Sequence, residues 1–440
     1  MNDARSPLRS MSLALASYPV RDVVFGERTR LAGTTLEIER AALLGVAGAG
    51  ASVLASVEVD LARPGARTRI IHVIDALEPR WKQAPAGAPA FPGFLGPAEV
   101  TGTGRTHRLD GVAVLTTGNI PGAEGSQGLK EAIVDMTGPA AELTPVGRLV
   151  NVVLRFEVAP GIPVPEALHA IRLAGLRVAT WLAETTRTLA PASVETLTLG
   201  PADPALPRVV YIAPMMREGA VHTTFIYGMP VESLPLVLHP NEVLDGGVVT
   251  ADYWIACHRI PTYLYQNEPV VRALYARHGR DVNFVAVLAC RSLVTSEPEK
   301  RRQAAQVAKV AAMLGADGAV ITMSNGGHAY ADQMLICQAV ERAGIKTVLG
   351  VDEYSDTDGS DVPLVIYVPE AEAIVSCGNQ EVLIDLPPME RLLGGERFVA
   401  GNLQEKAFTQ HPAEALTVAI RQLYAATAQV GAGRLTSRAF

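Results

Sequence analysis

Between residues 282 and 351 the sequence alternates short apolar runs with longer amphipathic segments, and this alternation constrains the fold more than any other feature. The runs at 282–289, 319–323 and 346–351 lack polar alternation, as expected of strands that are buried on both faces. Ser296 opens a capping-box sequence that is typical of a helix N-terminus, and a second helix is expected over 330–343. This order of strands and helices predicts a doubly wound parallel sheet.

The earlier part of the chain has a different pattern. From about residue 15 to 125, short alternating segments are broken by glycine and proline, which predicts a β-rich region; proline- and glycine-rich 84–97 is expected to be a surface loop. Further elements are expected as a helix over 165–187, strands over 149–158, 208–213, 221–227, 363–368 and 373–376, and a final helix over 412–428. We therefore expect an α/β protein with a β-rich domain at 1–145, an α/β middle region at 146–256 and a doubly wound α/β domain at 257–440.

Composition excludes several classes of function. A net charge of −7 without long runs of lysine or arginine argues against nucleic acid as a partner. The longest uncharged run, 41–57, contains three glycines and is too short for a membrane span, and its G-x-x-G-x-G is not a dinucleotide fingerprint. The four cysteines are widely spaced, which argues against a zinc site or a disulfide framework and suits a reducing cytoplasm. No metal or nucleotide cofactor is evident.

One stretch, I-A-C-H-R-I-P-T-Y-L-Y-Q-N-E-P at 255–269, contains a cysteine in an unusual setting. Cys257 is followed directly by His258 and Arg259, and two neighbouring cations favour the nucleophilic thiolate form of a cysteine. The structural alternative is a cysteine at a strand end that has no chemical role. The two readings stay open at this point.

Ligands of parallel sheets gather at the carboxyl ends of the strands. In this chain the expected strand ends carry polar or small residues that become candidate site residues: His328 after Gly326–Gly327, Asp352, Glu353, Gly378 and Asn379. Each has a plain alternative as a helix cap or a turn residue. Because these ends meet at one edge of the sheet, we expect the side chains of Cys257, His328 and Asp352 to border one cavity.

Seven short motifs follow one another in an order that is familiar. They are D-L-A-R-P-G-A-R-T-R-I (60–70), D-A-L-E-P-R (75–80), F-P-G (91–93), D-M-T-G-P (135–139), Y-Q-N-E-P-V (265–270), V-D-E-Y (351–354) and L-P-P-M (386–389). With them, the chain resembles the component B α/β proprotein of the glycine/sarcosine/betaine reductases, which are related to the D-proline reductase proprotein. The resemblance extends from about Val20 to Gly395.

This resemblance implies a chemistry. Family members are made as one chain that is cut before an internal cysteine, whose thiolate attacks the preceding carbonyl to give a thioester; elimination and hydrolysis leave a pyruvoyl group. Such a carbonyl forms an imine with a substrate amine and withdraws electrons. A second subunit supplies a selenocysteine or cysteine that attacks the α-carbon, the C–N bond breaks reductively, and thioredoxin-type thiols close the cycle. The implied substrate is a small amine- or nitrogen-containing carboxylate.

On this reading Cys257 is the candidate pyruvoyl precursor or, in an uncut chain, the nucleophile. His258 would exchange protons, Arg259 would pair with a thiolate or a substrate carboxylate, and Gln266 and Asn267 would orient the substrate by hydrogen bonds. The sequence departs from the family pattern at Asp252–Tyr253, where an Asn-Cys is expected, and this departure favours an uncut chain. Two alternatives remain: direct, non-reductive cleavage or hydrolysis of a C–N or C–S bond by Cys257, and a non-catalytic scaffold subunit. The apolar composition and the resemblance both predict a permanent partner subunit.

Overall fold

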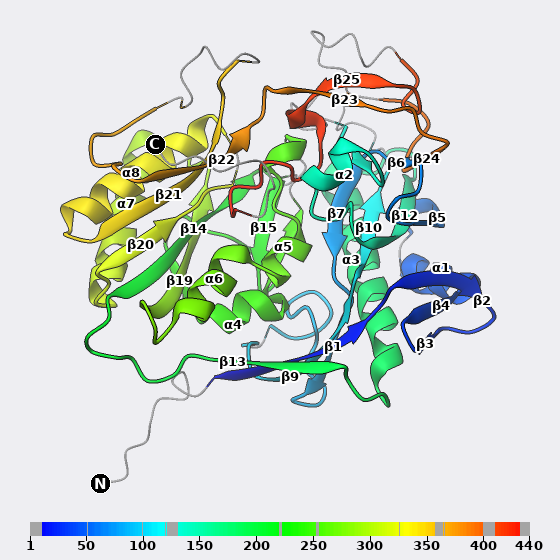
Figure 1. Ribbon diagram of the computed structural model, residues 1–440, viewed down its shortest axis with the longest axis horizontal. Coiled ribbons are helices and arrows are strands. Elements are labelled where there is room, and N and C mark those ends of the chain that lie inside the picture. Colours follow the sequence, from blue (N-terminus) through cyan, green and yellow to red (C-terminus); the bar gives the residue numbers. More distant parts are fainter. Residues whose placement is uncertain are drawn as a thin grey trace.

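A computed structural model describes residues 11–50, 52–98, 100–118, 120, 131–219, 222–251, 255–324, 326–356, 364, 366–398 and 410–431 of the chain. The helix α3 (Val164–Ala183) and most N-terminal strands lie on the right in Figure 1, and a parallel sheet with the helices α7 (Glu297–Met313) and α8 (His328–Arg342) lies on the left. The fold is therefore a mixed α/β structure with several sheets. Asp252 and Tyr253, where the family pattern is broken, lie outside the described residues.

The N-terminal part is β-rich, as predicted. Three sheets have the strand orders β13-β1-β9-β8, β5-β12-β10-β7 and β2-β4-β3, and a fourth joins β11, β6 and the late strand β24. The strands are β1 (Ser12–Pro19), β2 (Asp22–Gly26), β3 (Arg30–Ala32), β4 (Thr35–Glu39), β5 (Leu54–Ala62), β6 (Thr68–Ile70), β7 (Val73–Leu77), β8 (Arg80–Ala84), β9 (Gly104–Asp110), β10 (Val112–Thr117), β11 (Val134–Asp135), β12 (Val150–Val158), β13 (Ser193–Thr198) and β24 (Arg391–Leu393). The short helices α1 (Arg40–Gly48) and α2 (Pro139–Leu143) lie between them.

The long helix α3 (Val164–Ala183) covers the sheet that contains β7 and β10. It begins after Pro163, and its apolar stripe, which includes Leu168 and Ile171, is buried in one large core. The helix approaches the sheet closely at Gly175, where an added Cβ would lie 2.7 Å from Thr116 and 2.9 Å from Leu77. Any larger residue at this position would therefore require the Thr116 and Leu77 side chains to move.

The predicted parallel sheet is confirmed. Its strand order is β19-β14-β20-β21-β22, and all four neighbouring pairs are parallel. Its strands are β14 (Arg208–Glu218), β19 (Asn283–Ser292), β20 (Gly318–Ile321), β21 (Lys346–Glu353) and β22 (Ile374–Asn379). Antiparallel strands continue it: β17 (Leu236–Leu238) pairs with β19, and β15 (His222–Ile226), β16 (Met229–Pro230) and β18 (Val248–Ala251) branch from the end of β14.

Helices cover both faces of this sheet. On one face α7 (Glu297–Met313) and α8 (His328–Arg342) pack on a core that includes Val210 and Ile212 of β14. On the other face α6 (Pro269–Arg277) packs against β19, where Tyr211 and Ala213 of β14 contribute to the main core. Ser296 caps α7, because its hydroxyl accepts a hydrogen bond from the backbone N–H of Glu299 at 3.4 Å. The alternation of β14 side chains between two cores explains the continuous apolar sequence of the strands.

The predicted final helix over 412–428 is wrong. This segment forms the strand β25 (Leu416–Ala419), antiparallel to β23 (Leu383–Leu386), and a single turn, η6 (Ile420–Gln422). Ala425 then has a positive φ of 58°, which no α-helix contains. The alanine-rich composition has high intrinsic helix propensity, but pairing with a distant strand overrides it.

Two smaller expectations also need correction. The expected strand over 363–368 is absent at 364 and 366–368, while 363 and 365 lie outside the described residues. The 84–97 segment is irregular as predicted, but it is not wholly on the surface: Ala90 and Phe91 are buried in the core beneath α3. The strand predicted at 373–376 is confirmed as part of β22.

The division at residues 145/146 and 256/257 stays a prediction. Backbone hydrogen bonding crosses the second boundary, since β14 precedes it and pairs with β19 and β20, which follow it. In the part of the chain that the structure describes, no helix is both long and apolar enough to cross a membrane.

Candidate active site

Cys257 lies at the centre of a short turn, η4 (Ala256–His258), just before α5 (Thr262–Gln266). All three residues of the turn are buried, and Cys257 packs beside Ile71, Ile133 and other apolar residues. One polar group approaches the thiol: its Sγ lies 3.8 Å from the amide oxygen of Gln380 and donates a weak hydrogen bond to it. The cysteine is therefore neither at a strand end nor exposed to solvent.

The next residue, His258, forms a buried ion pair. Its Nε2 lies 2.5 Å from Oδ2 of Asp352 at the carboxyl end of β21, and neither side chain is exposed. Burial alone would lower the pKa of His258, but the negative charge of Asp352, assisted by the neighbouring Cys257 and Tyr354, outweighs this effect and raises that pKa well above its ordinary value. The histidine is therefore held as an imidazolium next to the cysteine.

Other residues hold Asp352 in place. Its Oδ1 accepts hydrogen bonds from the hydroxyl of Tyr330 at 2.6 Å and from the side-chain amide of Gln429. Burial and the neighbouring Asp352 charge raise the pKa of Tyr330 well above its ordinary value, so this hydroxyl stays a donor. The ring of Tyr354 lies 5.8 Å from that of Tyr330 and 6.2 Å from that of His258. These contacts fix the carboxylate on the imidazolium.

Glycine is required where the loop after β20 (Gly318–Ile321) meets this cluster. A Cβ at Gly326 would lie 2.1 Å from the Tyr354 hydroxyl oxygen and 3.0 Å from Cε1 of His258. The Gly-Gly pair that the sequence suggested as a turn therefore also makes room for the two rings.

A segment near the C-terminus closes over the turn that carries Cys257. The backbone N–H of Ala425 donates to the carbonyl of Ala256 at 2.8 Å, and the N–H of Thr427 donates to the carbonyl of Cys257 at 3.1 Å. The Ala256 carbonyl also accepts from the N–H of Arg259 at 3.3 Å. The oxygen of the peptide that precedes the cysteine thus has two backbone donors.

The side chain of Arg259 reaches the N-terminal strand β7. It is buried, and its Nη1 donates to the backbone carbonyl of Val73 on β7 at 2.6 Å. Burial, assisted by the positive charge of Arg259, lowers the pKa of His222 to about 3, so His222 stays neutral. Arg259 therefore ties the cysteine-bearing turn to the N-terminal sheets.

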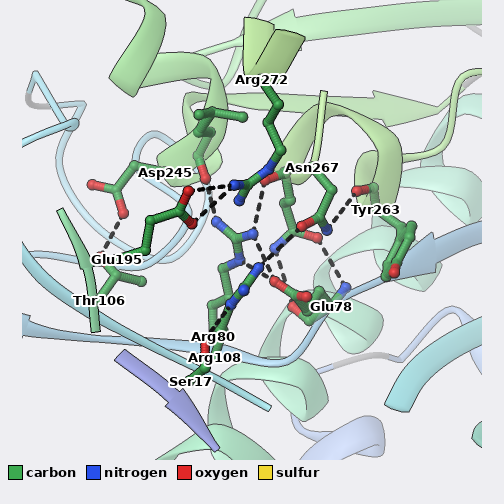
Figure 2. A network of polar contacts seen from close by, with 12 residues as sticks. Ser17, Glu78, Arg80, Thr106, Arg108, Glu195, Asp245, Tyr263, Asn267 and Arg272 are labelled. Atoms are coloured by element: carbon green, nitrogen blue, oxygen red, sulfur yellow. Dashed lines mark hydrogen bonds and ion pairs between the residues drawn. The ribbon is translucent and has the colours of Figure 1, made fainter. Parts of the chain in front are cut away.

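Gln266 and Asn267 belong to a different network (Figure 2). The Gln266 amide bonds to the backbone N–H and carbonyl of Glu78, at 2.9 and 3.0 Å. Asn267 accepts from Arg108 at 3.4 Å and donates to the Tyr263 carbonyl at 3.1 Å. Both side chains bond to the protein itself, and their predicted role in orienting a substrate stays a prediction.

The remaining candidates lie around the sheet edge. His328 is exposed at the start of α8, and its carbonyl accepts from Lys300 at 3.2 Å. Glu353 is half-buried. The Gly378 N–H donates to the Ser376 hydroxyl at 3.1 Å, and Asn379 donates to the Asp356 carbonyl at 3.3 Å. The structure therefore joins Cys257, His258 and Asp352, whereas the proposed cavity shared with His328 stays a prediction.

Comparison with known proteins confirms the family that the sequence motifs indicated. The profile of the family described as glycine/sarcosine/betaine reductase component B subunits matches residues 11–438. The chain belongs to this family. The glycine reductase complex component B subunits alpha and beta of Peptoclostridium acidaminophilum are 33% identical over 445 residues, covering 98% of this chain and all of the relative. The corresponding protein of Acetoanaerobium sticklandii is 31% identical with the same coverage.

Two further relatives belong to sister complexes of Peptoclostridium acidaminophilum. The sarcosine reductase complex component B subunit alpha is 32% identical, covering 87% of this chain and 89% of the relative. The betaine reductase complex component B subunit alpha is 34% identical, covering 87% and 88%. No solved structure matches the chain. The family places this component B chain among the oxidoreductases that act on C–N bonds.

The sequence did not predict three polar residues of the cluster around Cys257, His258 and Asp352. They are Tyr330, Gln380 and Gln429. Tyr330 lies one helical turn after the Gly-Gly loop, and Gln380 directly follows the strand that ends in Gly378–Asn379, so the strand-end rule came close to both. Gln429 has no such signal, because it lies 77 residues from the carboxylate it contacts, directly after the segment predicted to be helical. Among the described residues, no group of three or more His, Cys, Asp or Glu is arranged to hold a metal ion.

Proposed function

We propose that this component B chain binds a small amine-containing carboxylate and takes part in the reductive cleavage of its C–N bond. A partner subunit with a redox-active selenol or thiol supplies the attacking atom, and thioredoxin-type thiols restore it. The observation that carries this proposal is the turn that buries Cys257 beside the His258–Asp352 ion pair. A buried thiol, an imidazolium and a fixed carboxylate are the groups expected where a nucleophile and a proton are handled together.

The residues around Cys257 have separate roles in this proposal. His258, ion-paired with Asp352 through Nε2, is the group that gives a proton to or takes it from the reacting amine. Tyr330 and Gln429 orient Asp352 through its second oxygen, so the imidazole keeps one orientation. The buried apolar wall beside Cys257 keeps water away from the thiol.

The surroundings of Cys257 fit a pyruvoyl group made from this residue. An attack of the thiolate on the Ala256 carbonyl would place negative charge on an oxygen that already accepts from the N–H groups of Ala425 and Arg259. A pyruvoyl group, when present, supplies a carbonyl that captures an amine and withdraws electrons. His258 and Gln380 are the side chains placed to hold it.

A partner surface is supported at the edge of the large sheet. β17 is an edge strand there, and apolar side chains in and just before it are strongly exposed: Leu234, Leu236 and Val237. Such an edge is a suitable place for the second subunit of a reductase complex.

The test replaces Cys257 and measures amine release. Cys257→Ala should lower the substrate-dependent rate of the complex, reconstituted with its partner subunit and a dithiol, by about 10³-fold or more, since no other nucleophile replaces the thiol. Cys290→Ala is the matched control, because Cys290 is equally buried but lies in the core between β19 and α7. Full activity in Cys257→Ala would favour the scaffold reading instead.

Intact-mass measurement under denaturing conditions then separates the two uses of Cys257. Two complementary masses for residues 1–256 and 257–440, lost in Cys257→Ala, indicate a carbonyl formed at the new terminus. A single full-length mass with retained activity indicates that the thiol itself reacts.

A further inference from the structure

Arg172 is a buried arginine whose hydrogen-bonding groups lack acceptors. It lies in the middle of α3 and is 8% exposed. Its Nε is fully buried without a hydrogen bond, and within the described residues the guanidinium forms no hydrogen bond and no ion pair within 4.0 Å. An arginine carries five N–H donors and keeps its charge, so burial without acceptors destabilises the fold.

Other buried arginines of this chain show the usual solution. Arg69, which is not exposed at all, binds both oxygens of Asp135 at 2.7 and 2.9 Å and donates to three backbone carbonyls as well. Arg80 binds the Glu78 carboxylate at 2.6 Å and donates to two carbonyls. Arg172 differs from both of these buried arginines, because in the described part of the chain it binds neither a carboxylate nor a backbone carbonyl.

Two aromatic rings lie against the Arg172 guanidinium. Its Cζ lies 4.4 Å from the ring centroid of Phe225 and 5.6 Å from that of Phe94, and the two rings contact each other edge to face. Cation–π contact attracts the charge, but it leaves the N–H groups, which lie in the plane of the guanidinium, without partners. The rings therefore orient the fork of donors and do not satisfy it.

Asp75, the carboxylate whose charge acts on Arg172, already accepts hydrogen bonds from other groups. Asp75 accepts from the N–H of Ala76 at 2.8 Å and from the N–H and hydroxyl of Thr262 at 2.9 and 2.7 Å. Burial raises the pKa of Asp75 to about 7, against these hydrogen bonds, and burial lowers the pKa of Arg172 to about 10, against the charge of Asp75. Asp75 cannot move to Arg172 without giving up Thr262, at the start of α5.

We propose that Arg172 is the binding site of a small carboxylate, held by the two-pronged guanidinium beside the Phe94 and Phe225 rings. Two oxygens on one carbon match the planar fork, which is the geometry that arginine prefers for carboxylates. The carboxylate comes either from an amino-acid-like substrate or from a free carboxylate that stays bound. The link from Asp75 to Thr262 connects this site with the segment that carries Cys257. The identification of the carboxylate as part of the substrate rests on the proposed function. The existence of an anion site at Arg172 does not.

The first experiment is thermal unfolding of the full chain at constant ionic strength. Sodium acetate and glycine should each raise the Tm saturably, by roughly 2–5 °C over sodium chloride. Glycinamide, which lacks the carboxylate, should not. A response to acetate alone identifies a free carboxylate as the source, and competition between acetate and glycine identifies the substrate. The absence of a specific shift with both acetate and glycine overturns the proposal.

Variants locate the site. Arg172→Met removes a buried charge, so without carboxylate it should unfold at the wild-type Tm or above, whereas in saturating acetate the wild type should be the more stable protein. Arg177→Met on the same helix, whose guanidinium donates to the Ala49 carbonyl, should keep the full acetate shift. An acetate shift that survives in Arg172→Met overturns the assignment. Repeating the titration in Cys257→Ala keeps this result independent of the chemistry at Cys257.

Discussion

Two buried polar regions of this molecule invite comparison: the cluster around Cys257 and the network around Arg80 (Figure 2). In the network, Arg80 binds Glu78 and two carbonyls, and Arg272 binds both oxygens of Glu195. Its cations are arginines, whose charge does not change with pH. The cluster instead combines a thiol with His258, whose proton is set by Asp352.

The difference lies in what each region can do chemically. The charged groups of the network pair with one another and with backbone carbonyls, and the network contains no thiol, so its expected role is to join the N-terminal strands to α5 and α6. The cluster contains a nucleophile and a transferable proton. Buried charge alone therefore does not mark a functional site; a titratable group next to a nucleophile does.

The largest expected effect is on stability, in the network. Arg80→Met leaves Glu78 as an uncompensated buried carboxylate, and the free energy of unfolding should fall by about 3–5 kcal/mol in a denaturant titration. The paired variant Arg80→Met with Glu78→Gln should recover most of this loss, since it removes both charges. If the single variant retains wild-type stability, the network is not structural and the comparison fails.

A pH-dependent effect of intermediate size is expected in the cluster. The pKa of His258 is raised in the folded protein, so its contribution to stability is complete below about pH 6.5, the unfolded value, and is lost as the pH rises through the folded value. The difference in unfolding free energy between wild type and His258→Gln should therefore shrink above pH 6.5, by up to about 1.4 kcal/mol per pH unit. Chemical denaturation from pH 6 to 9 measures this slope.

Other titrating groups do not disturb that measurement, because Asp75 and Glu268, with pKa values of about 7 and 8, are present in both proteins and cancel in the difference. The paired variant Arg80→Met with Glu78→Gln serves as the contrast: it removes both charges, so its difference from wild type should stay nearly constant over the same range. A flat difference for His258→Gln would mean that its proton is not tied to Asp352.

The smallest effect is expected at Asn267, on the edge of the network. Its bond to Arg108 is long at 3.4 Å and the residue is half-buried, so Asn267→Ala should cost about 0.5–1.5 kcal/mol of unfolding free energy. The kcat/KM for amine release should change by no more than a few-fold. A loss of kcat/KM beyond about tenfold with unchanged stability would indicate that Asn267 binds the substrate.

Local sequence features predicted the central part of the fold. Continuous apolar strands and the Ser296 cap are short-range signals, and they led to the parallel sheet that is observed. The strand-end rule found Asp352, and the cations beside Cys257 drew attention to the turn that carries it. What failed depends on distant pairing: β25 lies against β23, and the positive φ of Ala425 has no signal in an alanine-rich stretch. The same pairing brings Gln429 to Asp352, which no local pattern could show.

The position of β14 has a consequence for any cut before Cys257. β14 belongs to the upstream piece, yet it lies hydrogen-bonded between β19 and β20 of the downstream piece, in the middle of one sheet. Severing the peptide bond breaks none of these ladders and exposes none of the cores on either face. A severed chain would therefore sediment and elute as a single particle, and its two pieces would be partners from the moment of scission, with no association step and no dependence on concentration.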